Sequence, residues 1–465
     1  MQLRRINRDL DKSINWEKLL LTFMFFISFS IFVLYATTRS SEFNHSLNIN
    51  SLMSIALILV SSFMLAFSVA TENLQFVSML FWMFELIFFG LTGYSYSQDT
   101  NPEYLAHEVS ENSLFNAHIL CMMSALMVAF LQLFFHFSKD DRSHTKFEYM
   151  QVDIKVVVGR LKKLSVIYSL TAPLVLLKIG GMGYLFKRGA NSLNLNLDSL
   201  ALQSIFESFI LVVPLLITVS QILLSFNHDI KFNLLWRSAF LIWCLILANP
   251  LSHPRQTVFF MVVPLIYAAH KRFQIIGLLC VYGIPFILLY LSNVINRYTG
   301  QIQISTKIPI LSRAGDLDAF PQLANGLDKV ALGAFPIMHQ ILGSLFFFVP
   351  RQFWENKPLD TGVVLGQLSG LHFVNLSAPW VLEAFVNARW IGVILVAGLI
   401  GLYLGKTDES RSASLKIQTT HAIIAGSLFI VLRGSLLQAT GRLALALLLT
   451  TLIFKKIPSY LLAKY

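Results

Sequence analysis

Long runs of apolar residues, separated by short polar stretches, fill almost the whole chain of 465 residues. An α-helix needs about 20 consecutive apolar residues to cross the hydrocarbon core of a bilayer, and runs near that length recur from one end of the chain to the other. These runs are too uniformly apolar for the strands of a membrane β-barrel, in which apolar and polar positions alternate. The pattern therefore predicts membrane-spanning α-helices.

About twelve spans are predicted, within one or two, because several runs are short. They cover Leu19–Ala36, Ser51–Ala70, Phe76–Ser95, Leu114–Phe137, Leu164–Phe186, Ser204–Phe226, Leu234–Asn249, Thr257–Ala269, Phe273–Val294, Trp390–Gly405, His421–Leu436 and Leu443–Phe454. No repeat or linker divides the chain. We therefore treat residues 1–465 as a single all-α integral membrane domain.

One long segment, residues 293–389, interrupts the spans between the ninth and the tenth. It contains the stretches RAGDLDAF (313–320), FFFVPRQFWENKPLDTG (346–362) and NLSAPWVLEAFVN (375–387). The part from Asp316 to Val349 is apolar with scattered polar positions, which predicts amphipathic helices that lie on the membrane or dip into it. Because loops carry function more often than spanning helices do, we expect the chemistry of the protein here.

Composition supports this class and gives an orientation. Hydrophobic residues make up 55% of the chain and charged residues 13%, which excludes a soluble globular protein. Lys and Arg are absent from two predicted loops, Gln98–Ser113 and Ala190–Gln203, and most lie in the loops on the other side. Cytoplasmic loops are enriched in these cations, so both termini are expected in the cytoplasm and residues 293–389 outside. The net charge of +11 forms no dense basic block, so no nucleic-acid partner is expected.

Neither a metal nor another cofactor is expected. The three cysteines, Cys121, Cys244 and Cys280, all fall inside predicted spans and show no paired spacing. Asp316 and Asp318 have Asp-x-Asp spacing, but no further cluster of oxygen ligands lies near them in the sequence.

Arginines at the expected outer face are the strongest chemical signal. Arg255 follows Pro250 and Pro254, which break the helix there and leave backbone N–H groups unpaired. The guanidinium group matches phosphate oxygens with two parallel hydrogen bonds, so these residues are candidates for binding an anion. Taken singly, each could equally be a surface arginine that reaches the lipid headgroups. The set comprises Arg255, Arg313, Arg351, Arg433 and Arg442.

Three elements of the long segment carry a family resemblance. Gly315–Phe320, Val349–Pro358 and Asn375–Glu383 stand where the Wzy-type polymerases of O-antigen and capsule repeat units have Gly-Asp-x-Asp-Ala-Phe-like, Val-Pro-Arg-x-x-Trp-x-x-Lys-Pro and Asn-x-Ser-x-Pro elements. The chain resembles this family over about residues 310 to 405, with Arg255 upstream. It departs at Ala388–Arg389–Trp390, where family members more often have Phe-Gly.

The resemblance implies a scaffold of the GT-C type, shared with lipid-linked glycan polymerases and ligases, in the bacterial inner membrane. The enzyme would be a glycosyltransferase that moves the growing glycan from undecaprenyl pyrophosphate onto a new undecaprenyl-pyrophosphate-linked repeat unit, without a metal ion. The five arginines would hold the diphosphate. Candidates for the general base are Asp316, Asp318, Glu383 and His253, and candidates for contacting the glycan are Trp354, Trp380, His339 and His372.

Other interpretations of these residues stay open. Asp316 and Asp318 equally suit a salt bridge with Arg313 and helix capping, and the tryptophans suit an aromatic belt at the membrane interface. An O-antigen ligase shares the donor and the large outer loop, and a transporter is a third class, although few charges lie within the spans. Membrane lipid is an expected partner, and a chain-length regulator is a further partner that the sequence leaves open.

Overall fold

The structure is a computed structural model that describes residues 14–39, 47–71, 73–99, 109–138, 154–186, 200–228, 230–250, 252–294, 310–371, 376–407 and 413–455. These residues are mostly helical, and their β structure is limited to isolated bridges such as that between Ile14 and Thr71. The prediction of an all-α protein is therefore confirmed for the described part of the chain.

Eight helical stretches of the described part are long and apolar enough to cross a membrane. Seven are single helices: α2 (Trp16–Thr38), α3 (Ile49–Ala70), α6 (Glu111–Phe137), α9 (Leu200–His228), α16 (Trp380–Lys406), α17 (Leu415–Arg433) and α18 (Leu436–Ile453). The eighth joins α4 (Phe76–Phe84), a π-helical turn η1 (Glu85–Leu91) and α5 (Thr92–Gln98). A multi-pass membrane protein is thus what the helices indicate.

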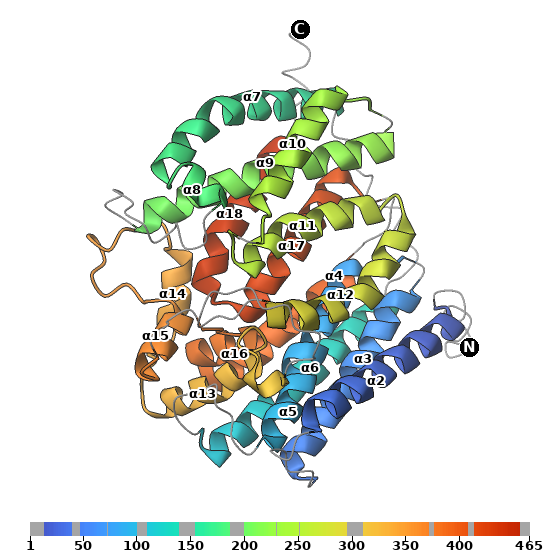
Figure 1. Cartoon of the computed structure of the whole chain (residues 1–465), viewed down its shortest axis with the longest axis vertical. Coiled ribbons are helices and arrows are strands. Elements are labelled where there is room, and N and C mark those ends of the chain that lie inside the picture. Colours follow the sequence, from blue (N-terminus) through green and yellow to red (C-terminus); the bar gives the residue numbers. More distant parts are fainter. Residues whose placement is uncertain are drawn as a thin grey trace.

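The other four predicted spans are also helical but fall short of that criterion. They correspond to α7 (Ile154–Lys178) with the short α8 (Met182–Phe186), and to α10 (Leu234–Leu247), α11 (Arg255–His270) and α12 (Gln274–Val294). The number twelve and the GT-C scaffold therefore stay predictions. In Figure 1 the helices α2, α3 and α6 pack together in the lower right, and α7 and α10 pack on α9 in the upper part.

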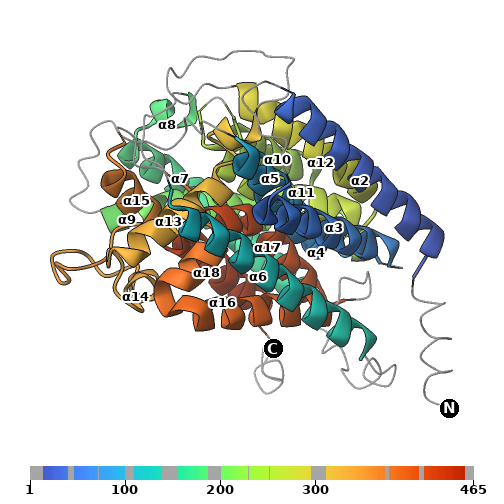
Figure 2. The ribbon, with the colours of Figure 1, turned by 90° about the horizontal axis from the view of Figure 1, so that it is seen from below.

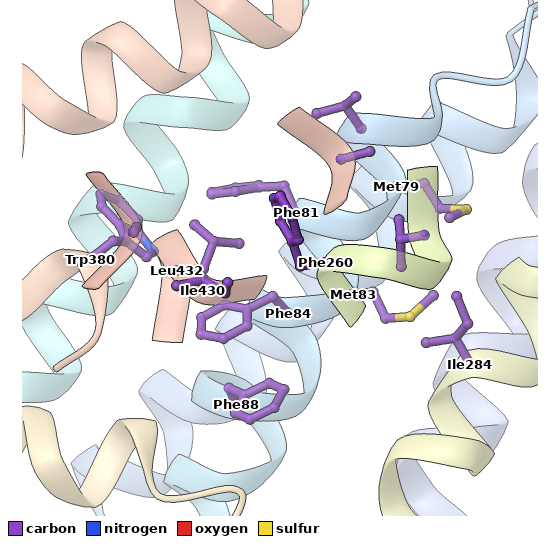
Figure 3. Packing of buried hydrophobic residues seen from close by; sticks show 14 of the residues in the cluster. Met79, Phe81, Met83, Phe84, Phe88, Phe260, Ile284, Trp380, Ile430 and Leu432 are labelled. Atoms are coloured by element: carbon purple, nitrogen blue, oxygen red, sulfur yellow. The ribbon is translucent and has the colours of Figure 1, made fainter. Parts of the chain in front are cut away.

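The segment from Phe76 to Gln98 forms the centre of the core. Its first part, Phe76–Phe84, is almost entirely apolar, as expected for a helix surrounded by other helices, and almost all of the segment is buried. Figure 3 shows Phe81, Phe84 and Phe88 of this segment among Phe260 of α11 and Trp380 of α16. The rings of Phe84 and Phe88 stack with centroids 4.5 Å apart. Because lipid is as apolar as these side chains, close packing rather than removal from water stabilises this contact.

Small residues let α16 approach α6 closely, and Figure 2 shows the two helices side by side. Gly401 and Gly405 are spaced four residues apart on the same face of α16. A Cβ at Gly401 would lie 3.0 Å from the carbonyl oxygen of Val128, and one at Gly405 would lie 2.9 Å from that of Gln132. This is the small-xxx-small packing that joins helices in membranes, and a larger side chain at either glycine would push them apart.

The long polar segment folds as short helices on one side of the molecule, at the left of Figures 1 and 2. They are η4 (Leu311–Arg313), α13 (Ala319–Ala331), α14 (His339–Leu345) and α15 (Thr361–Leu368). The first nine residues of α13, 319–327, are all buried, and the helix packs against α6, α15 and α16. The first nine residues of α13 are therefore enclosed by other protein elements, and the expectation that helices between Asp316 and Val349 lie on the membrane or dip into it stays a prediction.

The helix α16 is interrupted by the non-helical residues Ala388 and Arg389, so a short helical part from Trp380 precedes the break, and the part from Trp390 onward coincides with the predicted tenth span. Arg389 has φ 54°, a left-handed conformation that favours glycine. Its guanidinium donates to the carbonyl oxygens of Phe335, at 3.2 Å, and Val386, at 3.3 Å. The arginine thus stabilises a break that a glycine would accept without strain.

Candidate functional site

The segment from Arg313 to Asp318, just before α13, joins three elements that are distant in sequence. Three arginine–aspartate ion pairs meet it, from the end of α5, the start of α11 and the end of α17. Asp316 and Asp318 lie on the segment itself, as does Arg313. The GDLD stretch is therefore the point at which the structure gathers three of the five predicted arginines.

Arg313 pairs with Asp99, the residue that follows α5. Its Nε and Nη2 donate to the two carboxylate oxygens at 3.0 and 2.9 Å, which is the two-bond geometry that makes Arg–carboxylate pairs strong. The hydroxyl of Ser312 donates to the same carboxylate at 2.6 Å. Sequence reasoning missed Asp99. Its position directly after a span, in a stretch without Lys or Arg, could have pointed to it.

Arg255 pairs with Asp316. Arg255 is the first residue of α11, placed there by Pro254, which is the N-cap and ends the preceding loop. The arginine and aspartate side chains are 20% and 18% exposed, so a solute can reach both. Among the three ion pairs, the pair of Arg255 and Asp316 combines a partly accessible cation with a partly accessible carboxylate.

Asp318 pairs with Arg433 at the end of α17, at 2.7 Å, but its side chain is fully buried. The hydroxyl and the backbone N–H of Ser377 also donate to it, the latter at 3.3 Å. The backbone N–H of Ala378 donates to the carbonyl of Arg433 at 3.0 Å. Asp318 was predicted as a candidate base. Its burial and its three donors correct this, because the carboxylate ties the 376–378 loop to α17 and faces no open space.

Arg442 and His253 form a second group beside Arg255. Arg442 donates to the hydroxyl of Thr257 at 3.3 Å and lies 4.0 Å from the carboxylate of Glu207. The buried ring of His253 packs on the ring of Tyr184, with centroids 4.8 Å apart. Burial first, and the positive charge of Arg442 second, lower the pKa of His253 to about 4. His253 is therefore neutral at physiological pH and only a weak proton acceptor.

Arg351 does not join these groups among the described contacts. It is exposed and donates to the backbone carbonyls of Lys357, at 2.5 Å, and Pro358, at 3.0 Å. The ammonium of Lys357 in turn donates to the carbonyls of Phe347, at 2.7 Å, and Val349, at 2.8 Å. Both side chains hold the turn after the FFFV stretch. The described contacts of Arg351 lie within this turn, and its place in a diphosphate clamp stays a prediction.

Glu383 and Asp360 approach the first turn of α18 together. Glu383 is buried and accepts from the backbone N–H of Leu436 at 3.4 Å. Asp360 caps α15 by accepting from the N–H of Gly362 at 2.9 Å, and it also accepts from the hydroxyl of Ser435. Within the described residues neither carboxylate has an Arg or Lys in ion-pair distance. Glu383 was predicted as a candidate base, whereas Asp360 was not predicted.

The residues predicted to contact glycan separate in the structure. His339 and Trp354 lie together, with ring centroids 6.5 Å apart, beside exposed aromatic residues of the 346–353 turn. His372 lies outside the described residues. Trp380 is 3% exposed and donates to Glu85 of the π-helical turn at 3.0 Å. The prediction for Trp380 is therefore wrong, because a tryptophan sealed in the core offers no face to a sugar ring.

Across the described ranges, no group of three or more His, Cys, Asp or Glu side chains could hold a metal ion. Asp316 pairs with Arg255 and Asp318 pairs with Arg433, so each carboxylate contacts an arginine rather than a shared cation position. No family model matches the chain, and no curated protein and no solved structure matches it either. A function for the site can therefore be inferred only from the arrangement of its own residues and from the sequence resemblance.

Proposed function

We propose that this protein is a polymerase of lipid-linked oligosaccharide repeat units at the outer face of a bacterial inner membrane. It moves the growing glycan from undecaprenyl pyrophosphate onto the terminal sugar of a new lipid-linked unit. The proposal is supported by the resemblance over residues 310 to 405 and by eight helices suited to a membrane. The observation that carries it is the exposed pair of Arg255 and Asp316, because Asp316 belongs to the resembling Gly315–Phe320 element.

The chemistry needs one group for the leaving diphosphate and one for the incoming hydroxyl. The bond between the anomeric carbon and the diphosphate oxygen breaks, and the hydroxyl oxygen bonds to that carbon. Negative charge develops on the diphosphate, and a guanidinium at a partly water-excluded site stabilises it. The hydroxyl must lose its proton to a carboxylate within hydrogen-bond reach. Arg255 supplies the first group and Asp316 the second.

Pairing of the two side chains in the ligand-free protein fits this division of work. Asp316 neutralises Arg255 while the site holds no anion. A diphosphate that takes the guanidinium donors releases the carboxylate, which then accepts the proton of the acceptor hydroxyl. Arg313, locked on the buried Asp99, and Arg433, locked on the buried Asp318, hold the segment in place. Their roles are thus to position the Arg255–Asp316 pair.

Replacement of Arg255 by Ala tests the proposal in a strain whose surface polysaccharide depends on this protein. Loss of one preorganised donor to a developing anion costs roughly 10²- to 10³-fold in rate, so long chains should collapse to single capped units on a polysaccharide gel. Lys329→Ala removes a cation from the neighbouring helix α13 and is the matched control, expected to keep the normal ladder. Membrane levels of both variants are compared by immunoblot.

Two outcomes contradict the proposal. A normal ladder in Arg255→Ala, with normal protein level, would remove Arg255 from the reaction. Long chains that accumulate without attachment to the lipid core in a strain lacking the protein would indicate a ligase, since a ligase acts after polymerisation is complete.

A further inference from the structure

An apolar groove runs between α7 and α10, far along the chain from the GDLD segment. Its volume is about 310 Å³. The main lining residues are Tyr168, Ala172 and Leu176 of α7 and Ala239, Phe240 and Trp243 of α10. The hydroxyl of Tyr168 accepts from the indole N–H of Trp243 at 2.7 Å and donates to the carbonyl of Ile210 on α9 at 3.0 Å. The polar atoms of the two largest lining groups are thus satisfied within the protein, and the wall is left apolar.

Both helices of the groove end near the same polar group. After α7 the chain turns through Gly180 and Gly181, which have positive φ, into α8 with Tyr184. After α10 it reaches His253, whose ring contacts the ring of Tyr184. Arg442 lies beside both residues, held by Thr257 and more loosely by Glu207. The two helices that form the groove are therefore each followed by residues of one polar group, which contains Arg442 and a buried His253 whose Nε2 has no hydrogen-bond partner.

The open side of the groove faces the surroundings of the helix bundle. Leu170, Leu174 and Leu177 on α7 and Ile242 and Leu245 on α10 are exposed, and apolar side chains on the outside of membrane helices contact lipid. A hydrocarbon chain can therefore enter sideways from the bilayer, while its polar end reaches Arg442 and His253. An amphiphile with an anionic head and a long chain has this shape.

We infer that the groove between α7 and α10 binds the isoprenoid chain of the lipid-linked substrate, with the phosphate end directed to Arg442 and His253. This inference rests on the proposed function for the identity of the lipid. Aromatic rings alternate with small alanines along the wall, which gives a slot with room for branched, planar isoprene units. The chain held there places the phosphates beside the start of α11, next to Arg255.

Binding of undecaprenyl phosphate to the purified full-length protein tests the inference. Ala239 is exposed and lines the groove, so Ala239→Phe fills it without disturbing the core. We expect the Kd for undecaprenyl phosphate to rise about tenfold, because the added ring would exclude roughly two methylene groups of the lipid chain from the groove. Ala331→Phe adds the same ring at an exposed alanine of α13, outside the groove, and is the matched control, with an unchanged Kd. Geranyl phosphate, whose chain is short, should bind weakly to all variants.

An unchanged Kd in Ala239→Phe, with an unchanged unfolding temperature, would overturn the inference. If Ala239→Phe does not fold, Ser169→Phe fills the groove from the α7 wall, with Ala331→Phe again as the control. The readout is independent of polymer formation. Loss of long chains in a deletion strain together with unaltered lipid binding in the groove variants would refute the groove and leave the proposed function standing. Normal long chains in the deletion strain would refute the function, whatever the binding result.

Discussion

Asp316 and Asp318 are separated by a single residue, and each faces an arginine from a distant helix, yet their surroundings differ. The region around Asp316 is open, with both members of its ion pair about one-fifth exposed. The region around Asp318 is sealed, and the carboxylate receives Arg433 together with the hydroxyl and N–H of Ser377. The same sequence motif thus supplies one accessible carboxylate and one structural carboxylate.

The comparison shows that burial, rather than residue type, separates chemistry from support at this site. A carboxylate with three donors in the interior has no capacity left for a substrate proton, and removing it leaves an unpaired buried cation. The partly exposed pair of Arg255 and Asp316 costs less to open than the sealed pair, since water screens it more. A ligand can therefore compete for Arg255 but not for Arg433.

The largest effect is expected for Asp316→Asn on activity. The amide keeps the size of the side chain but cannot take the hydroxyl proton, so polymer formation should fall by roughly 10²- to 10⁴-fold. Stability should change by less than about 1 kcal/mol, because the lost pair is partly exposed. Chain length is measured on a polysaccharide gel and the unfolding temperature in detergent. A full ladder of chain lengths in Asp316→Asn would show that the carboxylate of Asp316 is not needed for polymer formation.

The second effect is expected for Asp318→Ala on stability. Loss of the carboxylate leaves the guanidinium of Arg433 buried without its partner, which costs about 3–5 kcal/mol. The protein should therefore unfold at a lower temperature in detergent and fall in amount in the membrane. Asp318→Asn, which keeps an acceptor for Ser377, should lose less. If both variants unfold at the same temperature as the parent protein, Asp318 does not stabilise the fold.

The smallest effect is a pH dependence that comes from Asp360, a carboxylate with no arginine among the described residues. Burial raises the pKa of Asp360 above the ordinary value of 3.8 for an aspartate, although hydrogen bonds from Ser435 and Gly362 act in the opposite direction. The folded state therefore binds the proton more tightly than the unfolded state does. Stability is highest below 3.8 and falls as the pH rises from there through the pKa of the folded state.

Asp360→Asn tests this sign. The amide keeps an acceptor for the N–H of Gly362 and carries no charge, so the fall of the unfolding temperature between about pH 4 and pH 7 should be shallower than in the parent protein. Asp316→Asn is the control, because it also removes one carboxylate, but this carboxylate is paired with the cation Arg255. Equal slopes in Asp360→Asn and the parent protein would contradict the prediction.

Much of the architecture could be predicted from single stretches of sequence. Each of the twelve predicted spans coincides with a helix at least in part, and eight stretches meet the length and hydropathy needed for a membrane. This succeeds because apolarity over about 20 residues is a local property. The predicted start of the tenth span at Trp390 coincides with the helical part of α16 that follows the break at Ala388 and Arg389, whereas the short helical part from Trp380 was not predicted.

The candidate site was predictable only in part. Arg255, Arg313 and Arg433 were found from their residue type and their position next to apolar runs, but the partner Asp99 and the carboxylate Asp360 were not. Trp380 was predicted at the surface because tryptophan is common at membrane interfaces, and instead its N–H satisfies the buried Glu85. A side chain's exposure depends on the elements packed around it, which the neighbouring sequence does not contain.

By itself, the sequence determined that the protein is α-helical and suited to a membrane, and that its polar chemistry is concentrated in one segment with a few outlying arginines. Only the tertiary structure decided which aspartate meets which arginine, across 61, 115 and 214 residues of chain. Hydrophobic runs act locally through their length, whereas an ion pair forms only where folding brings its two members together. The distinction between the open Asp316 and the sealed Asp318 arises at that step.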